Sequence, residues 1–115
     1  MVNVVIRRHE EDDSFVATPA LIDTGADYSA ITPLILDKLT PFRTGEVYVE
    51  NYSGRGMMVE LYAVSVEFHG WKFTQVLSVL GSDEYVILGR NLLNLFDLRL
   101  NGIDGKLEFL RGPQV

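Results

Sequence analysis

The sequence contains no cysteine among its 115 residues. Disulfide bridges, thiol nucleophiles and cysteine-ligated zinc are therefore excluded, and the composition is compatible with a reducing compartment. The two histidines, His9 and His69, lie near predicted turns without the spacing of metal ligands. We therefore expect no metal site.

Long apolar runs and dense basic clusters are also missing. No run approaches the roughly 20 residues of a membrane-spanning helix. The N-terminus, "MVNVVIRRHEEDD", turns charged too early for the apolar core of a signal peptide. The net charge is −6 and the ten Lys and Arg residues are scattered, which argues against nucleic-acid and membrane partners. We expect a cytoplasmic protein.

What is present suits one compact domain over residues 1–115. Hydrophobic residues make up 47% of the chain and charged residues 23%, which is enough apolar material for a core. Because so small a chain buries a limited share of its surface, self-association is a natural expectation.

Alternation of apolar and polar residues predicts a mostly β architecture. The acidic stretch "HEEDD" between the first two strands is typical of a solvated hairpin turn, and glycines at 54 and 56 predict a tight turn between the third and fourth. The predicted strands cover residues 2–8, 14–22, 45–51, 57–68, 71–80, 85–88, 98–101 and 106–110.

Two short helices interrupt the strands. Thr32 followed by Pro33 is typical of an N-cap and a first helical position, so the sequence predicts a short helix from Pro33 through "LILDKL", residues 34–39, that ends before Pro41. A second short helix is predicted within "GRNLLNLF", residues 89–96.

The stretch "LIDTGAD", residues 21–27, places an acid at the end of an apolar strand. Gly25 permits a turn in which backbone N–H groups approach the Asp23 carboxylate. A lone carboxylate at a partly dry position is costly. Two such groups that share one proton form a working acid–base pair.

A second stretch, "VILGRNLLN" at residues 86–94, is a plausible support for that loop. Gly89 would let two chain segments pack closely. Arg90 is a fixed cation that is expensive to bury alone, and Asp27 is its predicted partner.

Together these two stretches resemble the retropepsin-like aspartic proteases, in the single-domain form found in cells and bacteria. The motifs occur in the family's order, and the resemblance extends from about Val4 to Leu110. It implies a closed, mostly β barrel with a flap hairpin. The extra C-terminal hairpin predicted around residues 102–105 resembles cellular members more than retroviral ones.

The resemblance also implies roles for individual residues. Asp23 would be the catalytic aspartate, with Thr24 and Gly25 shaping its loop and the Thr24 hydroxyl gripping the partner subunit. Ala26 and Asp27 would line the substrate channel. Gly89 and Arg90 would brace that wall. Further substrate contacts would come from an apolar pocket and from the flap, at Tyr85, Ile87, Tyr52, Ser53, Gly54, Arg55, Gly56 and Met57.

A single motif implies that the catalytic pair forms across the two-fold axis of a homodimer. The implied activity is that of an aspartic endopeptidase acting on a peptide or protein, without metal or organic cofactor. A second interpretation is a non-catalytic dimer or peptide-binding module that keeps the fold. A calcium loop at residues 97–108 is disfavoured, because Arg99 stands at a ligand position.

Overall fold

We describe a computed structural model of the chain, leaving out residues 51–53, 82–83, 96, 102–105 and 112–115. Of residues 97–101 and 106–111 we describe the backbone alone. The elements are β1 (Val2–Arg7), β2 (Val16–Ile22), β3 (Ser29–Ile31), α1 (Pro33–Leu39), β4 (Phe42–Glu50), β5 (Gly56–Phe68), β6 (Trp71–Leu80), β7 (Val86–Leu88), α2 (Arg90–Leu93), β8 (Asp97–Asn101) and β9 (Lys106–Arg111).

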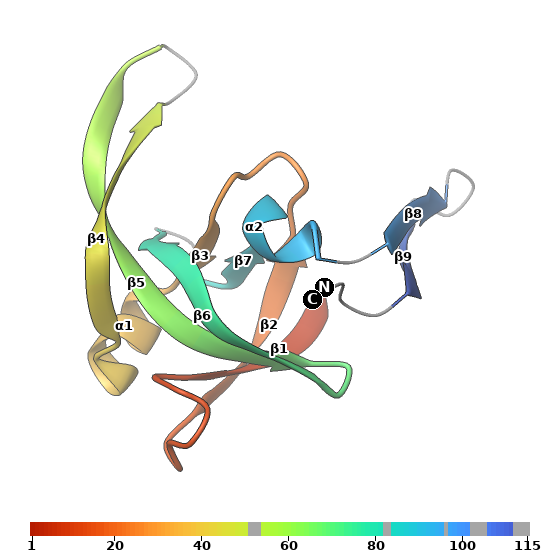
Figure 1. Ribbon diagram of the computed structural model, residues 1–115, viewed down its shortest axis with the longest axis horizontal. Helices are drawn as coiled ribbons and strands as arrows, with labels where there is room; N and C mark the ends of the chain where they lie inside the picture. Colours follow the sequence, from red (N-terminus) through yellow and green to blue (C-terminus); the bar gives the residue numbers. More distant parts are fainter. Residues whose placement is uncertain (51–53, 82–83, 96, 102–105, 112–115) are drawn as a thin grey trace.

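A seven-stranded sheet closes on itself to form a barrel (Figure 1). Its order is β1-β2-β7-β3-β6-β5-β4, and β5 also pairs with β1. The closing pairs run antiparallel from Val5 opposite Glu67 to Arg7 opposite Ser65. β4 alone of these strands lies outside the ring, so six strands form the barrel.

The barrel interior is apolar, as the alternation along the strands predicts. Val4 and Ile6 of β1 are 1% and 0% exposed, while the residues between and beside them are more accessible. The most deeply buried side chains elsewhere include Ile31, Leu88 and Leu92. This core fixes the register of each strand, because a shift by one residue would turn the apolar face outward.

Helix α1 begins and ends as the sequence predicts. The Thr32 hydroxyl accepts a hydrogen bond from the Ile35 N–H at 3.3 Å, and Pro33 occupies the first turn. At the other end Thr40 adopts a left-handed conformation with φ of 42°. The helix buries Ile35 and Leu39 against the core.

The paired strands β4 and β5 extend beyond the barrel as a two-stranded arm (Figure 1). We call the part from residue 46 to 50 and from residue 56 to 60 the β4–β5 arm. Its exposed large apolar side chains are those of Tyr48, Val49, Met57 and Met58. The arm is the element that corresponds to the predicted flap hairpin.

Strands β8 and β9 pair antiparallel, from Leu98 opposite Phe109 to Asn101 opposite Lys106. The predicted C-terminal hairpin is therefore present, and it lies to one side of the barrel in Figure 1. Its "GIDG" connection lies outside the described residues.

The predicted boundaries differ most from the structure at β4, β2 and α2, and elsewhere by about one residue. β4 begins at Phe42 rather than at residue 45, because a bulge between Arg43 and Gly45 breaks the alternation that marks a strand. β2 begins at Val16 rather than at residue 14. α2 is a single turn, Arg90–Leu93, and is shorter than predicted. No helix in the described part of the chain is long and apolar enough to cross a membrane.

Candidate active site

Asp23 follows directly on the last residue of β2. This strand runs parallel to β7, with Ile22 opposite Leu88. The Asp23 N–H continues the ladder by donating to the Leu88 carbonyl at 3.1 Å. The core therefore holds the backbone of this acid, while its side chain is half-buried at the barrel end.

The turn after Asp23 wraps around its carboxylate. The Gly25 N–H donates to Asp23 Oδ1 at 2.9 Å, and the Ala26 N–H donates to the Asp23 carbonyl at 3.3 Å. A Cβ on residue 25 would lie 3.3 Å from Oδ1, so glycine leaves room for this contact. Among the described residues no other hydrogen bond reaches the carboxylate, and Thr24 beside it is exposed.

The far side of the loop is held by the start of α2. The Arg90 N–H donates to the Ala26 carbonyl at 2.7 Å, and the Asn91 N–H donates to the Asp27 carbonyl at 3.2 Å. A Cβ on Gly89 would lie 2.4 Å from the Tyr28 carbonyl oxygen. Only glycine therefore permits this approach, which is the close packing expected from the sequence.

The predicted ion pair between Asp27 and Arg90 is present. Arg90 Nη2 contacts Asp27 Oδ1. The Asp27 side chain is 72% exposed and that of Arg90 is 51% exposed, so the pair lies at the surface rather than in the core. Solvent screens such a pair, and we expect it to orient the loop more than to stabilise the fold.

Beneath the ion pair lies a polar network that the sequence analysis did not find. Asn91 Oδ1 accepts hydrogen bonds from both the Ser29 N–H and the Ser29 hydroxyl at 3.0 Å. The Gly89 N–H donates to Ser29 Oγ at 3.1 Å, and Asn91 Nδ2 donates to the Leu77 carbonyl at 2.8 Å. The signal for it was Ser29, a polar residue in an apolar stretch and only 2% exposed.

A groove of about 530 Å³ lies beside this loop. Of the predicted substrate-binding residues, Ala26, Asp27 and Ile87 line it, whereas Tyr85 does not. Gly25 lines it as well. The groove also has lining residues that sequence reasoning missed: Tyr28, Ala30, Tyr48, Val49, Glu50 and Val79. Its two sides are thus the loop from Gly25 to Tyr28 and the outer part of β4, whereas Asp23 and Thr24 do not line it.

The predicted flap residues lie at the end of the arm. Tyr52 and Ser53 fall outside the described residues. The others, Gly54, Arg55, Gly56 and Met57, are exposed. Three of these, Arg55, Gly56 and Met57, line a smaller hollow of about 180 Å³ together with Val49 and Glu50. Because Val49 and Glu50 also line the larger groove, the two hollows adjoin.

Where the arm joins the barrel, Glu60 and Tyr62 of β5 are the two described residues with a perturbed pKa. The Tyr62 hydroxyl donates to Glu60 Oε2 at 2.6 Å, and Arg43 Nε donates to Glu60 Oε1 at 3.0 Å. The Tyr62 bond, followed by Arg43, lowers the pKa of Glu60. The same bond to Glu60 raises the pKa of Tyr62.

Within the described residues no three His, Asp or Glu side chains are grouped so that they could hold a metal ion. The Asp23 loop itself supplies a carboxylate and backbone N–H donors, and it forms one wall of a groove. These are the parts that acid–base chemistry on a bound chain requires.

No family model and no curated protein matches the sequence. Solved structures do match. The Simian Foamy Virus (mac) protease has a TM-score of 0.55 at 12% identity, over 76% of this chain and 87% of that one. EIAV protease, solved with the inhibitor HBY-793, has a TM-score of 0.52 at 24% identity, over 80% and 82%. A retropepsin-like aspartic protease from Rickettsia conorii has a TM-score of 0.53 at 25% identity, over 88% and 86%.

The chain therefore has a retropepsin-like fold, and its structural neighbours include two viral proteases and a retropepsin-like aspartic protease. The mostly β, closed barrel predicted from the two motifs is confirmed.

Proposed function

We propose that the protein is an aspartic endopeptidase that works as a homodimer, with Asp23 of each subunit in the active site. The observation that carries this proposal is the setting of Asp23. Its backbone is fixed by β7, one carboxylate oxygen is bound by the Gly25 N–H, and the residues that follow Gly25 in the same loop line a groove. The aspartic proteases among the structural neighbours support it.

The dimer follows from the chemistry. A single carboxylate cannot both activate water and protonate the substrate in one step, whereas two carboxylates that share a proton can. The sequence supplies one Asp-Thr-Gly motif. A two-fold axis close to Asp23 would bring this residue next to its own copy.

In the proposed reaction the ionised member of the pair takes a proton from a water molecule, and the resulting oxygen attacks the peptide carbonyl carbon. The protonated member donates its proton to the carbonyl oxygen. The tetrahedral diol then breaks the C–N bond as a proton passes to the departing amine. Atoms and charge balance without metal or cofactor.

The substrate would lie extended in the groove between the Asp23 loop and the arm. Ile87 and Val49 offer apolar contacts there, and Asp27 lies at the same wall. Exposed apolar side chains at the end of the arm, including Met57, would be covered when substrate or the second subunit is present.

The first test is hydrolysis of a peptide library by the wild-type protein and by Asp23→Asn. We expect the variant to lose at least about a thousandfold of the activity, because the acid–base pair is removed. Asp37→Asn, an exposed position on α1, is the control and should retain full activity. If wild type and Asp23→Asn both bind peptides as dimers without cutting them, the protein is a binding module instead.

The second test asks whether the site is shared. Wild type and Asp23→Asn are mixed in varying ratios and allowed to exchange subunits. If both subunits supply an Asp23, activity falls with the square of the wild-type fraction, to roughly one quarter at equal amounts. A linear fall to one half would show that each subunit works alone.

A further inference from the structure

A second hollow lies on the outer wall of the barrel, where two strands meet end to end along β5. Arg7 of β1 is opposite Ser65, and Phe42 of β4 is opposite Ala63. The hollow at this junction has a volume of about 700 Å³ and is larger than the groove at Asp23. The two share no lining residue.

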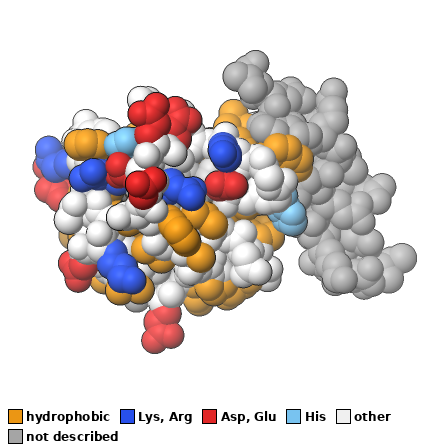
Figure 2. Space-filling model, turned by 90° about the horizontal axis from the view of Figure 1, so that it is seen from below, with side chains coloured by type: hydrophobic (Ala, Val, Ile, Leu, Met, Phe, Trp, Pro, Cys, Tyr) orange, Lys and Arg blue, Asp and Glu red, His pale blue; other side chains and the backbone are white. Residues whose placement is uncertain are grey.

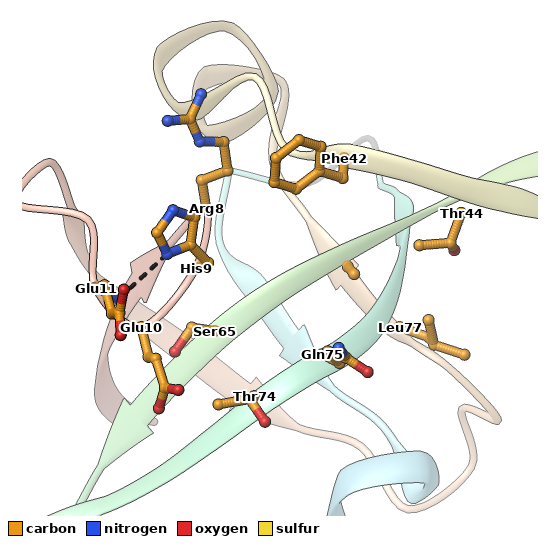
Figure 3. Close-up of a pocket in the computed structure, with 11 residues that line it drawn as sticks. Arg8, His9, Glu10, Glu11, Phe42, Thr44, Ser65, Thr74, Gln75 and Leu77 are labelled. Carbon is orange, nitrogen blue, oxygen red and sulfur yellow. Dashed lines mark hydrogen bonds between the residues drawn. The ribbon is translucent and has the colours of Figure 1, made fainter.

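A β-bulge forms the floor of this hollow. On β5 and β6, Val64 lies opposite Val76 and Val66 lies opposite Phe73. Two residues of β6, Thr74 and Gln75, therefore face the single residue Ser65 on β5, and all three line the hollow (Figure 3). Bulges commonly re-aim side chains beside functional sites.

Backbone strain marks the same bulge. Gln75 has φ of 54° in the middle of a strand, a conformation that costs a residue with a side chain free energy. The Gln75 side chain lines the hollow, with its amide available as both donor and acceptor.

Ser65 adds a hydrogen-bonding group to the wall of the hollow. It is 6% exposed, and its hydroxyl makes no hydrogen bond to any residue in the described part of the chain. The side chain borders the hollow near Glu10 (Figure 3). Because no buried side-chain polar atom among the described residues lacks a hydrogen-bond partner, this unpaired hydroxyl oxygen is open to solvent at the hollow, where a bound group can reach it.

The acidic and the apolar residues of the hollow lie on opposite sides of it. On one side Glu10 and Glu11 have no ion-pair partner among the described residues. A smaller hollow of about 250 Å³ continues past them and adds Asp13, the Arg7–Glu67 ion pair and Lys72. Figure 2 views the molecule from the side of the β1–β2 hairpin and shows acidic side chains on this face, with Lys and Arg side chains among them and hydrophobic ones beside them.

The opposite side of the hollow is apolar. Phe42 is 59% exposed and Leu77 is 36% exposed, and both line it. Arg8 Cζ lies 5.7 Å from the centre of the Phe42 ring. The Arg8 charge is matched by Asp12, whose Oδ2 accepts from Nε at 2.9 Å, so it does not neutralise Glu10 and Glu11.

We propose that this hollow is a docking site for a peptide segment of a protein partner that carries Lys or Arg close to a large apolar side chain. Glu10 and Glu11 would receive the cation, and Phe42 and Leu77 would contact the apolar side chain. Ser65 and Gln75 would hydrogen-bond the backbone between them. A metal ion is a poor fit, because the described acidic residues here form no group that could hold one.

The test is fluorescence anisotropy with a labelled peptide, Gly-Arg-Leu-Lys-Phe-Gly, added to the full chain. We expect binding that weakens at least about tenfold in the double variant Glu10→Gln/Glu11→Gln. The double variant Asp37→Asn/Glu46→Gln removes the same charge from exposed positions elsewhere and should change the affinity less than about twofold. Equal weakening in both double variants would show non-specific attraction and overturn the proposal.

Two further variants separate docking from other effects. Ser65→Ala should bind about fivefold more weakly without loss of thermal stability, since its hydroxyl has no partner in the free protein. Unchanged binding by Ser65→Ala, or absence of binding by the wild type, would also overturn the proposal. Asp23→Asn should bind as the wild type does, because the hollow is separate from the groove. This makes the test independent of the proposed protease activity.

Discussion

The loop that carries Asp23 and the β4–β5 arm form the two sides of one groove, and their residues are held in different ways. On the loop side, backbone hydrogen bonds from Arg90 and Asn91 fix residues 26 and 27, above the buried Ser29. On the arm side, large apolar residues are exposed, and β4 is an edge strand that pairs with β5 alone. A loop held in place before binding is what catalytic groups require. Exposed apolar residues such as those of the arm are instead suited to contacts that form when a partner binds.

The largest expected effect is at Gly89, where the loop side is most crowded. Gly89→Ala should lower the free energy of unfolding by about 3 kcal/mol or more, because its Cβ would collide with the Tyr28 backbone. Thermal unfolding measures the loss. Gly45→Ala on β4 is the control, since no heavy atom lies within 4 Å of its Cβ, and it should change stability by less than about 0.5 kcal/mol. Equal losses of stability in Gly89→Ala and Gly45→Ala would show that the loop at Gly89 is packed no more tightly than β4.

The next effect concerns the buried polar network. Ser29→Ala and Asn91→Ala should each cost about 1–3 kcal/mol, because each leaves buried partners without a hydrogen bond. The double variant should cost less than the sum of the two. Urea unfolding of all four proteins gives the coupling free energy. Strict additivity would mean that Ser29 and Asn91 act independently.

A smaller effect on stability is expected at the exposed ion pair. Asp27→Asn should cost less than about 1 kcal/mol, yet lower kcat/KM for peptide hydrolysis by about tenfold, because Asp27 lines the groove. Glu46→Gln removes one member of the Arg43–Glu46 pair, which lies outside the groove. It should leave hydrolysis unchanged. A similar loss in both variants would argue against a role for Asp27 in the groove.

The smallest expected change in stability is at Glu60 and Tyr62, where the arm joins the barrel. Because the folded pKa of Glu60 lies below its usual 4.5, the Tyr62–Glu60 bond stabilises the fold above that pH, and the effect is lost as pH falls further. Because the folded pKa of Tyr62 lies above 10.0, the effect is also lost in strong alkali. Tyr62→Phe should therefore be slightly less stable than the wild type at pH 7.

Urea midpoints for Tyr62→Phe and the wild type should converge below about pH 3. Tyr62 and Glu60 lie near the surface, so solvent keeps the difference small. A difference that persists unchanged in acid would show that ring packing, and not the hydrogen bond, is responsible.

Local signals predicted much of the fold. Thr32 and Pro33 marked a helix start, and alternation marked the long strands β5 and β6. The motif around Asp23 and the one around Arg90 also predicted that residues 27 and 90 would pair. In each case the physical cause lies in a few neighbouring residues or in a short motif.

Features that depend on distant partners were not predictable in this way. The sequence offers no local reason for Asn91 to bind Ser29 and Leu77 at once, because that geometry exists only after β3 and β6 have paired. The bulge at Gln75 and the hollow at Phe42 depend on three strands meeting. Such features form only when the barrel closes, and no local sequence pattern predicts them.

The bracing of the Asp23 loop by α2 also has a consequence for synthesis of the chain. Residues 26 and 27 are tied to residues 90 and 91, and the pairing of β2 with β7 spans a similar separation. As the chain is made from its N-terminus, Asp23 emerges long before the segment that sets its loop. Contacts so far apart in sequence form late and slowly. A nascent chain would thus remain without its candidate active site until residues 86–91 had left the ribosome.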